Sequence, residues 1–566
     1  MVRLLNLMVA CACGVASLLS ESSAGDPVAE LQSAAMATGR SGLGHWGTDP
    51  EKYSDWKTHS NRLVPVYTFG TGHADGALNL NHYTGPNSPY RSAEAVKRLY
   101  GRLPERTVTE TAVWMDQTNI ADLQTAAAAA GRQYIFLVVF DGMDWETTRA
   151  AAIYNQKSVG YRKGKGAGTH FQNYDAGGTA QFAFMVTSPH NDGTDTDVDL
   201  QTVTNPGGTV FGGYDPAAGG FAPWDMPADL GYLIAKPSEG LVRHAYTDSA
   251  SSATSMTAGI KTYNNAINVS SRGEQVATIA HDLQDQGWAV GAVSSVPISH
   301  ATPACAYAHN VTRQDYQDIS RDLLGLPSVA HPDHPLTGLD VIVGGGFGTT
   351  ADDGESQGSN FEPGSVYMAD SDLEKVSVAN GGKYVTAVRT PGRSGKEVLA
   401  NAAAIAAESG DRLLGFFGVG QYNGHLPFQT ANADYQPVRG VAKKAEAYSQ
   451  ADILENPTLA DMTVAALDVL QSRDSNFWLM VEAGDVDWAN HDNNLDNSIG
   501  AVNSGDAAVR VITDWVEANS NWEESMLIVT ADHGHLLMLT APELLAADSA
   551  SDTVDDSRQT DVEESE

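Results

Sequence analysis

Residues 134–144 read YIFLVVFDGMD, and this stretch sets the expected fold. The seven apolar residues 134–140 predict a strand that is buried on both faces, as in a parallel sheet. The polar residues after it end the strand, and residues 145–155 can form a helix. A buried strand followed by a helix is the repeating unit of parallel α/β sheets.

The same unit recurs along the chain. Further apolar runs predict strands at residues 288–293, 341–343, 413–417, 477–481 and 526–530. Helices are expected at residues 274–286, 395–407, 457–471 and 502–518. Strands that alternate with helices predict an α/β fold, a doubly wound and mostly parallel sheet with helices on both faces.

Composition narrows the classes of partner. The 566 residues are 42% hydrophobic, which is enough for a large core, and 70 acidic against 34 basic side chains give a formal net charge of -36. This charge argues against nucleic acids and anionic membranes as partners. Most of the excess is interpreted as a solvated acidic surface. An anionic substrate stays open, because bound cations can invert the local field in a site.

The first residues predict export to the periplasm or the medium. Arg3 precedes an apolar run at residues 4–19, and small residues at 22–24 suit cleavage. The run is too short and interrupted for a membrane span. Lipid attachment through Cys11 or Cys13 stays open. After cleavage Cys305 would be the remaining thiol, so no intramolecular disulfide is expected.

The expected organisation has four parts. They are a signal peptide at 1–24, a loop-rich N-terminal extension at 25–130, a catalytic domain at 131–545 and an acidic disordered tail at 546–566. The histidines at 45 and 59 could be metal ligands within the extension, but a loop-rich cover over the main domain is the favoured interpretation.

Residues 246–259, YTDSASSATSMTAG, carry the candidate nucleophile. Residues 241–246 were expected to form a half-buried strand, followed by a helix of small residues capped by Thr247 or Asp248. Ser249 would then lie at the helix N-terminus, where free N–H groups and the helix dipole favour an anion.

Carboxylates, imidazoles, hydroxyls and one guanidinium group follow several of the apolar runs. They are Asp141; Asp248 and Ser249; His300, Thr302 and Arg313; Glu482, Asp487 and His491; and Asp532 and His533. Each has a structural alternative, such as a turn residue, a helix cap or a surface pair. Because the carboxyl ends of parallel strands meet at one edge of the sheet, their shared position predicts a metal cluster there. Zinc takes imidazole and carboxylate, magnesium prefers oxygen ligands, and an arginine fork suits phosphate.

These motifs resemble the alkaline phosphatase family. The matching segments, in the order of that family, are FDGM at 140–143, TDSASSAT at 247–254, HATP at 300–303 through His309 to Arg313, VE at 481–482 with Asp487 and His491, and TADH at 530–533. The resemblance spans about residues 134–537. It leaves out the N-terminal hundred residues and two expected insertions, a polar one at 171–235 and another at 346–390.

The resemblance implies a role for each residue, with two Zn²⁺ and one Mg²⁺ as cofactors. Ser249 would be the nucleophile that becomes phosphoserine, and Arg313 would bind the phosphate. The expected ligands are Asp141, Asp532 and His533 for the zinc that activates Ser249, with Ser249 itself also touching this zinc; Asp487 and His491 for the second zinc; and Asp141, Thr302 and Glu482 for magnesium, with His300 behind that site.

One departure concerns the second zinc. The family completes it with a histidine in a longer C-terminal region, whereas the last histidine here is His535. Two histidines could replace the missing third ligand of the second zinc. They are His535, for which a structural role is favoured, and His425, which is expected to be remote from the site. Neither was included among the expected ligands.

The resulting hypothesis is an exported alkaline phosphatase that acts on small phosphate monoesters, with a homodimer left open. One alternative is a related hydrolase of diesters, sulfates or phosphonates. The other is a catalytically impaired homologue that binds phosphate or metal, which the missing C-terminal histidine would favour.

Overall fold

A computed structural model describes residues 26–234, 242–354 and 356–547. The predicted signal peptide, with Cys11 and Cys13, lies outside the described residues, as does all but the start of the predicted acidic tail. None of the helices in the described parts of the chain is long and apolar enough to span a membrane.

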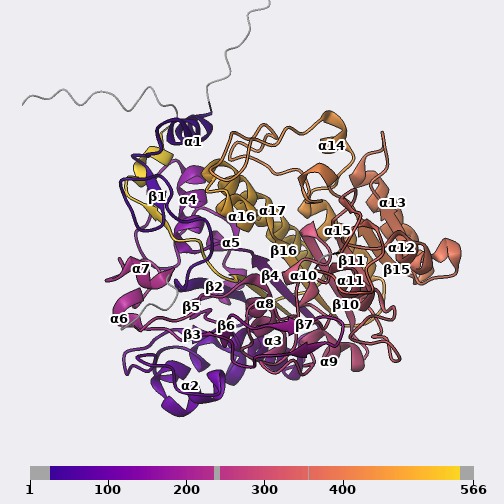
Figure 1. The fold of residues 1–566 in the computed structure, drawn as a ribbon, viewed down its shortest axis with the longest axis horizontal. Coiled ribbons are helices and arrows are strands. Elements are labelled where there is room, and N and C mark those ends of the chain that lie inside the picture. Colours follow the sequence, from indigo (N-terminus) through magenta and orange to yellow (C-terminus); the bar gives the residue numbers. More distant parts are fainter. Residues whose placement is uncertain (1–25, 235–241, 355, 548–566) are drawn as a thin grey trace, which may run out of the picture.

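A ten-stranded sheet forms the centre of this described part of the chain (Figure 1). Its order is β14 (Tyr384–Val388), β15 (Arg412–Phe416), β11 (Val341–Gly345), β10 (Ala289–Pro297), β16 (Phe477–Ala483), β4 (Tyr134–Phe140), β17 (Ser525–Ala531), β2 (Val64–Phe69), β5 (Gln181–Val186) and β3 (Met115–Asp116). The strands from β14 to β17 are all parallel. The predicted α/β fold, with a mostly parallel sheet, is confirmed.

The β4 strand sets the register of the site. Its last residue, Phe140, pairs with Ala483 on β16 and with Ala531 on β17. The next residues of these neighbouring strands therefore leave the sheet side by side, which brings Asp141 next to Asp532. The parallel pairing of β4 with both neighbours along all seven of its residues gives this alignment.

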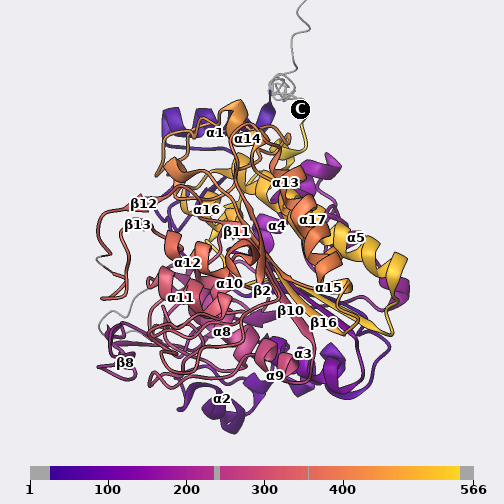
Figure 2. The same ribbon diagram turned by 90° about the vertical axis from the view of Figure 1, so that its right-hand side faces the viewer.

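Helices cover both faces of the sheet (Figure 2). On one face pack α4 (Trp145–Gln156), α13 (Gly395–Ser409), α15 (Leu459–Gln471) and α17 (Leu495–Asn519); on the other lie α3 (Asn119–Ala129), α8 (Ser249–Ala258) and α9 (Ile279–Asp285). Around them are α1 (Pro27–Thr38), α2 (Ala93–Tyr100), α10 (Ala301–Ala304), α11 (Tyr316–Leu324) and α16 (Asp485–His491). The helices bury their small and aliphatic side chains in one continuous core with the strands.

The segment 25–130 differs from the expected loop-rich extension. Its strand β2 lies inside the main sheet between β17 and β5, antiparallel to both. Within this segment, β1 (Gly44–Trp46) also pairs with β18 (Leu537–Leu539) near the other end of the described chain. The segment therefore shares the core of the sheet instead of covering it.

Two further local predictions need correction. Residues 242–248 form no strand, although Ala245 N–H bonds to Phe211 O across 2.8 Å. The helix predicted at 274–286 is shorter and begins at Ile279, where the Thr278 side chain caps it. In both places capping and loop contacts outweigh the local hydrophobic pattern.

Candidate active site

The candidate residues meet at the edge where the parallel strands end. Asp141 follows β4, Glu482 is the last residue but one of β16, and Asp532 follows β17. Ser249 starts α8, whose cap Asp248 accepts a hydrogen bond from Ser251 N–H. Gly142, next to Asp141, has φ of 74°, and a Cβ there would lie 2.8 Å from His535, so a glycine is needed for this approach.

One group of ligand atoms surrounds Ser249. Its Oγ lies 3.4 Å from Asp141 Oδ1 and 3.3 Å from His533 Nε2. His533 Nε2 lies 3.2 Å from Asp141 Oδ1 and 3.4 Å from Asp532 Oδ2. Atoms bound to one tetrahedral zinc at about 2.0–2.2 Å are about 3.3–3.5 Å apart. The predicted first set of zinc ligands is therefore spaced as such a site requires.

A second group contains a residue that was absent from the expected ligands. His59 Nε2 lies 3.1 Å from His491 Nε2, and both lie 3.4 Å from Asp487 Oδ1. These three atoms form a triangle of the size expected for one face of a tetrahedral zinc site. The sequence favours a loop-rich cover for His59; the residue lies in a loop, and its ring lies beside Asp487 and His491.

Backbone carbonyls set the tautomers of both histidines. His59 Nδ1 lies 2.9 Å from Thr247 O, and His491 Nδ1 lies 2.6 Å from Lys57 O. A carbonyl only accepts hydrogen bonds, so in each ring Nδ1 carries a proton, and Nε2 is the nitrogen that faces Asp487. Metal-binding histidines are commonly oriented in this way.

The two substitutes suggested from the sequence lie in different places. His535 is fully buried, and its Nε2 lies 2.7 Å from Asp487 Oδ1, so it can orient that carboxylate. His425 instead faces Glu446, with Nε2 3.2 Å from the carboxylate. His535 thus belongs to the group around Asp487, together with His59 and His533.

The three predicted magnesium ligands share one property. Each has a buried oxygen that lacks a hydrogen-bond partner in the described part of the chain: Asp141 Oδ2, Thr302 Oγ1 and Glu482 Oε1. An unpaired buried polar atom is costly, and a cation with a preference for oxygen would satisfy all three. The residues present therefore fit the group that the resemblance implies.

Electrostatics also favour cations here. Burial, then the nearby carboxylates Asp532, Asp487 and Glu482, raise the pKa of Asp141 well above its usual value. Burial raises the pKa of Glu482 to about 8 and that of Asp532 to about 6. Burial acts on Asp487 in the same direction, but its imidazole neighbours, with His491 first, hold its pKa well below the usual range. Bound cations would let all four carboxylates stay ionised at neutral pH.

Arg313 lies opposite the candidate nucleophile. Its Nη1 donates to Asp248 Oδ2 across 3.1 Å, and its backbone N–H bonds to Asn265 O across 2.8 Å. The guanidinium is thus held beside the residue that precedes Ser249. It can present its remaining N–H groups to an anion at the N-terminus of α8.

A cavity of about 300 Å³ opens over Ser249. It is lined by His59, Ser249, His300, Arg313, Asn423, Lys443, Asp487, Trp488 and His491. Burial lowers the pKa of His300 to about 3, so this imidazole is neutral. The volume suits a small ester.

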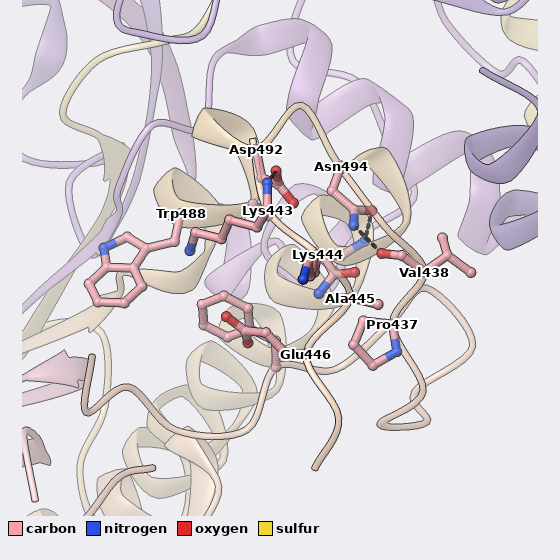
Figure 3. Close-up of a pocket in the computed structure, with 12 residues that line it drawn as sticks. Pro437, Val438, Lys443, Lys444, Ala445, Glu446, Trp488, Asp492 and Asn494 are labelled. Carbon is pink, nitrogen blue, oxygen red and sulfur yellow. Dashed lines mark hydrogen bonds between the residues drawn. The ribbon is translucent and has the colours of Figure 1, made fainter. Parts of the chain in front are cut away.

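Lys443 and Trp488 form part of the rim of this cavity. Figure 3 shows the Lys443 side chain extending toward Trp488, and its Nζ lies 5.2 Å from the ring centroid. The small pocket drawn there holds about 20 Å³, room for about one water, so the larger cavity is the place for a substrate. Lys443 adds a positive charge at its entrance.

A sequence signal for His59 did exist. The run VPVYTF at Val64–Phe69 begins five residues after it and predicts a buried strand. What the sequence does not give is the direction of that strand. Because β2 is antiparallel to β17, its start lies where β17 ends, and His59 arrives at the same edge as Asp532.

The sequence of the chain is similar to those of known proteins. The family model "Alkaline phosphatase" matches residues 233–560, which is more than half of the chain. The match includes Ser249 and the candidate residues after it and begins after His59 and Asp141.

Two relatives illustrate the similarity in sequence. Alkaline phosphatase 4 of Bacillus subtilis is 29% identical over 290 residues, which are 51% of this chain and 49% of the relative. Alkaline phosphatase of Escherichia coli K12 is 29% identical over 332 residues, 53% of this chain and 60% of the relative. The chain thus spans about half the length of the Bacillus relative.

Solved structures with similarity to the chain include a cold-active alkaline phosphatase from Shewanella sp. (TM-score 0.39, 21% identity, 71% of this chain and 68% of the other). Another is the alkaline phosphatase of Thermus thermophilus (TM-score 0.42, 20% identity, 71% of this chain and 60% of the other).

Proposed function

The chain belongs to the alkaline phosphatase family, and we propose that it is an exported enzyme that hydrolyses phosphate monoesters to an alcohol and inorganic phosphate. The observation that carries this proposal is the position of Ser249. It lies at a helix N-terminus, within 3.4 Å of two metal-ligand side chains and in the wall of a cavity that Arg313 also lines.

We assign the ligands as follows. Asp141, Asp532 and His533 would hold a zinc ion next to Ser249; His59, Asp487 and His491 would hold a second zinc; Asp141, Thr302 and Glu482 would hold magnesium. When bound, these cations neutralise the buried carboxylates and lower the pKa of the serine hydroxyl. His535 would orient Asp487. Neutral His300, two residues before Thr302 and in the wall of the cavity, would tune the magnesium site without binding the ion.

The reaction proposed for the chain has two steps. Ser249 loses its hydroxyl proton to solvent and its Oγ bonds to phosphorus while the bond from phosphorus to the ester oxygen breaks. The leaving alkoxide takes a proton from solvent. A water oxygen then attacks the phosphoserine, the bond from phosphorus to Oγ breaks, and inorganic phosphate leaves as the serine regains a proton. Arg313 binds two phosphate oxygens in both steps.

His59 bears on the alternative of an impaired homologue. That alternative depended on a missing third ligand for the second zinc. With His59 Nε2 3.4 Å from Asp487 Oδ1, the chain supplies a histidine for this place from its N-terminal segment. This favours a working enzyme over a protein that only binds metal or phosphate.

The proposal is tested by hydrolysis of an aryl phosphate monoester at alkaline pH. The protein is first stripped with a chelator and then assayed with and without zinc and magnesium, beside an aryl phosphodiester and an aryl sulfate. We expect metal-restored turnover of the monoester alone. Faster turnover of the diester or the sulfate would move the chain to the related hydrolases, and no turnover with any metal would favour the impaired homologue.

The nucleophile is tested separately. Ser249→Ala should remove the phosphoenzyme that is trapped by acid quenching with a ³²P-labelled ester, while zinc content stays unchanged. Labelled protein in Ser249→Ala would contradict the assignment. Light scattering of the metal-loaded protein tests the homodimer, and the N-terminus of protein recovered from the periplasm or medium tests export.

A further inference from the structure

A group of three metal-ligand side chains lies outside the active site. His309 follows α10, Asp322 lies on α11, and His331 lies in the loop between α11 and β11. A donor atom of each lies within 4.8 Å of the other two, and none of the three lines the active-site cavity. We propose that His309, Asp322 and His331 bind a zinc-class divalent cation at a structural site separate from the active site.

The spacing of the donor atoms suits one ion. His309 Nδ1 lies 3.0 Å from His331 Nε2, and His331 Nε2 lies 3.7 Å from Asp322 Oδ2. These values lie on either side of the roughly 3.3–3.5 Å that separates ligands on a tetrahedral zinc. Two imidazoles and one carboxylate are also the ligand types that zinc accepts.

Hydrogen bonds orient the donors toward one another. His309 Nε2 lies 3.0 Å from Val276 O, so this nitrogen carries the proton, and Nδ1 directs its lone pair toward His331. The carboxylate of Asp322 is held from both sides. Its Oδ2 accepts from His309 N–H across 2.9 Å, and its Oδ1 accepts from the Ser328 hydroxyl.

The alternative is a hydrogen bond from His331 Nε2–H to His309 Nδ1 without any ion. In that case the fully buried carboxylate of Asp322 has no Lys or Arg partner among the ion pairs of the described residues. A bound dication supplies the missing charge, which a neutral pair of imidazoles does not.

The surroundings hold the His309 ring in place and leave access for one further ligand beside the three side chains. The ring of His281 stacks on His309, with centroids 5.1 Å apart and 6° between the planes, which holds the imidazole in place. The side chain of His331 is 12% exposed, so a water can complete the coordination and an ion can enter there.

The site would connect three segments. It joins α11 and the loop that carries His331 to the segment of His309, which leads to Arg313 four residues later. An ion here would therefore fix the approach of the phosphate-binding arginine without touching the substrate. This inference does not depend on the proposed reaction, because its test measures bound metal.

The test compares His331→Gln with His334→Gln. His334 lies in the same loop and is exposed, so its variant is the matched control. Each protein is stripped, loaded with zinc, passed over a desalting column and analysed for zinc per chain. We expect His331→Gln to hold about one zinc ion fewer than the wild type and His334→Gln. Equal zinc content in all three would overturn the proposal.

A second pair of measurements separates the ion from the hydrogen bond. His331→Cys offers a thiolate to zinc but cannot restore the imidazole pair, so it should regain the zinc that His331→Gln loses. If the variants fail to fold, crystals of the zinc-loaded wild type still decide. An anomalous peak between His309, Asp322 and His331 is expected at the zinc edge. A map without this peak would contradict the proposal.

Discussion

His59 and His491 are separated by 432 residues in the sequence, yet their Nε2 atoms lie 3.1 Å apart. In both rings Nε2 faces the Asp487 carboxylate, because backbone carbonyls hold the Nδ1–H groups. The N-terminal segment is thus part of the candidate metal centre. Its removal would take away a ligand as well as strand β2 of the central sheet.

The first prediction follows from this pair. His59→Gln should lose about one zinc ion per chain and lower kcat/KM for an aryl phosphate by about 100-fold or more, since a ligand is lost outright. Metal analysis and steady-state kinetics measure both effects. His73→Gln is the control, because His73 is exposed in the same segment. A His59→Gln protein with full zinc content would rule out the assignment.

A second prediction concerns Arg313. Arg313→Ala should weaken the binding of inorganic phosphate, measured as a competitive inhibitor, by about 100-fold, because a charge-assisted double hydrogen bond is lost. Zinc content should not change. The exposed Arg272 serves as control through Arg272→Ala. A loss of zinc along with phosphate affinity would mean that Arg313 supports the metal centre instead.

A third prediction concerns the cavity entrance. Lys443→Gln should raise KM for a phosphate monoester by about 2- to 10-fold, with less effect on kcat. The ammonium group of Lys443 attracts the dianionic substrate toward the cavity, and salt weakens this attraction. Lys444→Gln removes the same charge from the next residue, which does not line the cavity. The difference between the variants should shrink at high salt. Equal effects of the two would point to net charge alone.

A fourth prediction uses a buried carboxylate away from the site. Burial raises the pKa of Asp496 to about 7, and its Oδ2 lacks a partner within the described residues. The folded state favours the protonated carboxyl of Asp496. The bound proton therefore contributes fully to the free energy of unfolding below pH 3.8, and this contribution is lost as the pH rises through 7.

At pH 8 the free energy of unfolding of Asp496→Asn should therefore exceed that of the wild type by roughly 2–4 kcal/mol. This difference in the free energy of unfolding should shrink toward zero as the pH falls to 4. Denaturant titrations at several pH values, with zinc and magnesium in excess, measure it. Asp514→Asn on the exposed side of the same helix is the control. A gap that does not vary with pH would contradict the role of this proton.

Much of the fold was predictable because its strands are continuous apolar runs. Those of β4, β16 and β17 were predicted to within a few residues, and their parallel alignment brings Asp141, Glu482 and Asp532 to one edge. The segment before Ser249 was not predictable in the same way. A short run of mixed polarity has no strong period, and contacts with distant loops decide its conformation.

The sequence by itself determined the ligand types and their order along the chain, since these depend on which residue follows each buried strand. Only the tertiary structure added His59 to the second group of ligands. The direction of β2 is set by its pairing with β17, a contact between segments more than 400 residues apart. Local patterns do not encode such pairing, so the antiparallel strand that carries His59 to the site could not be deduced from the run of residues alone.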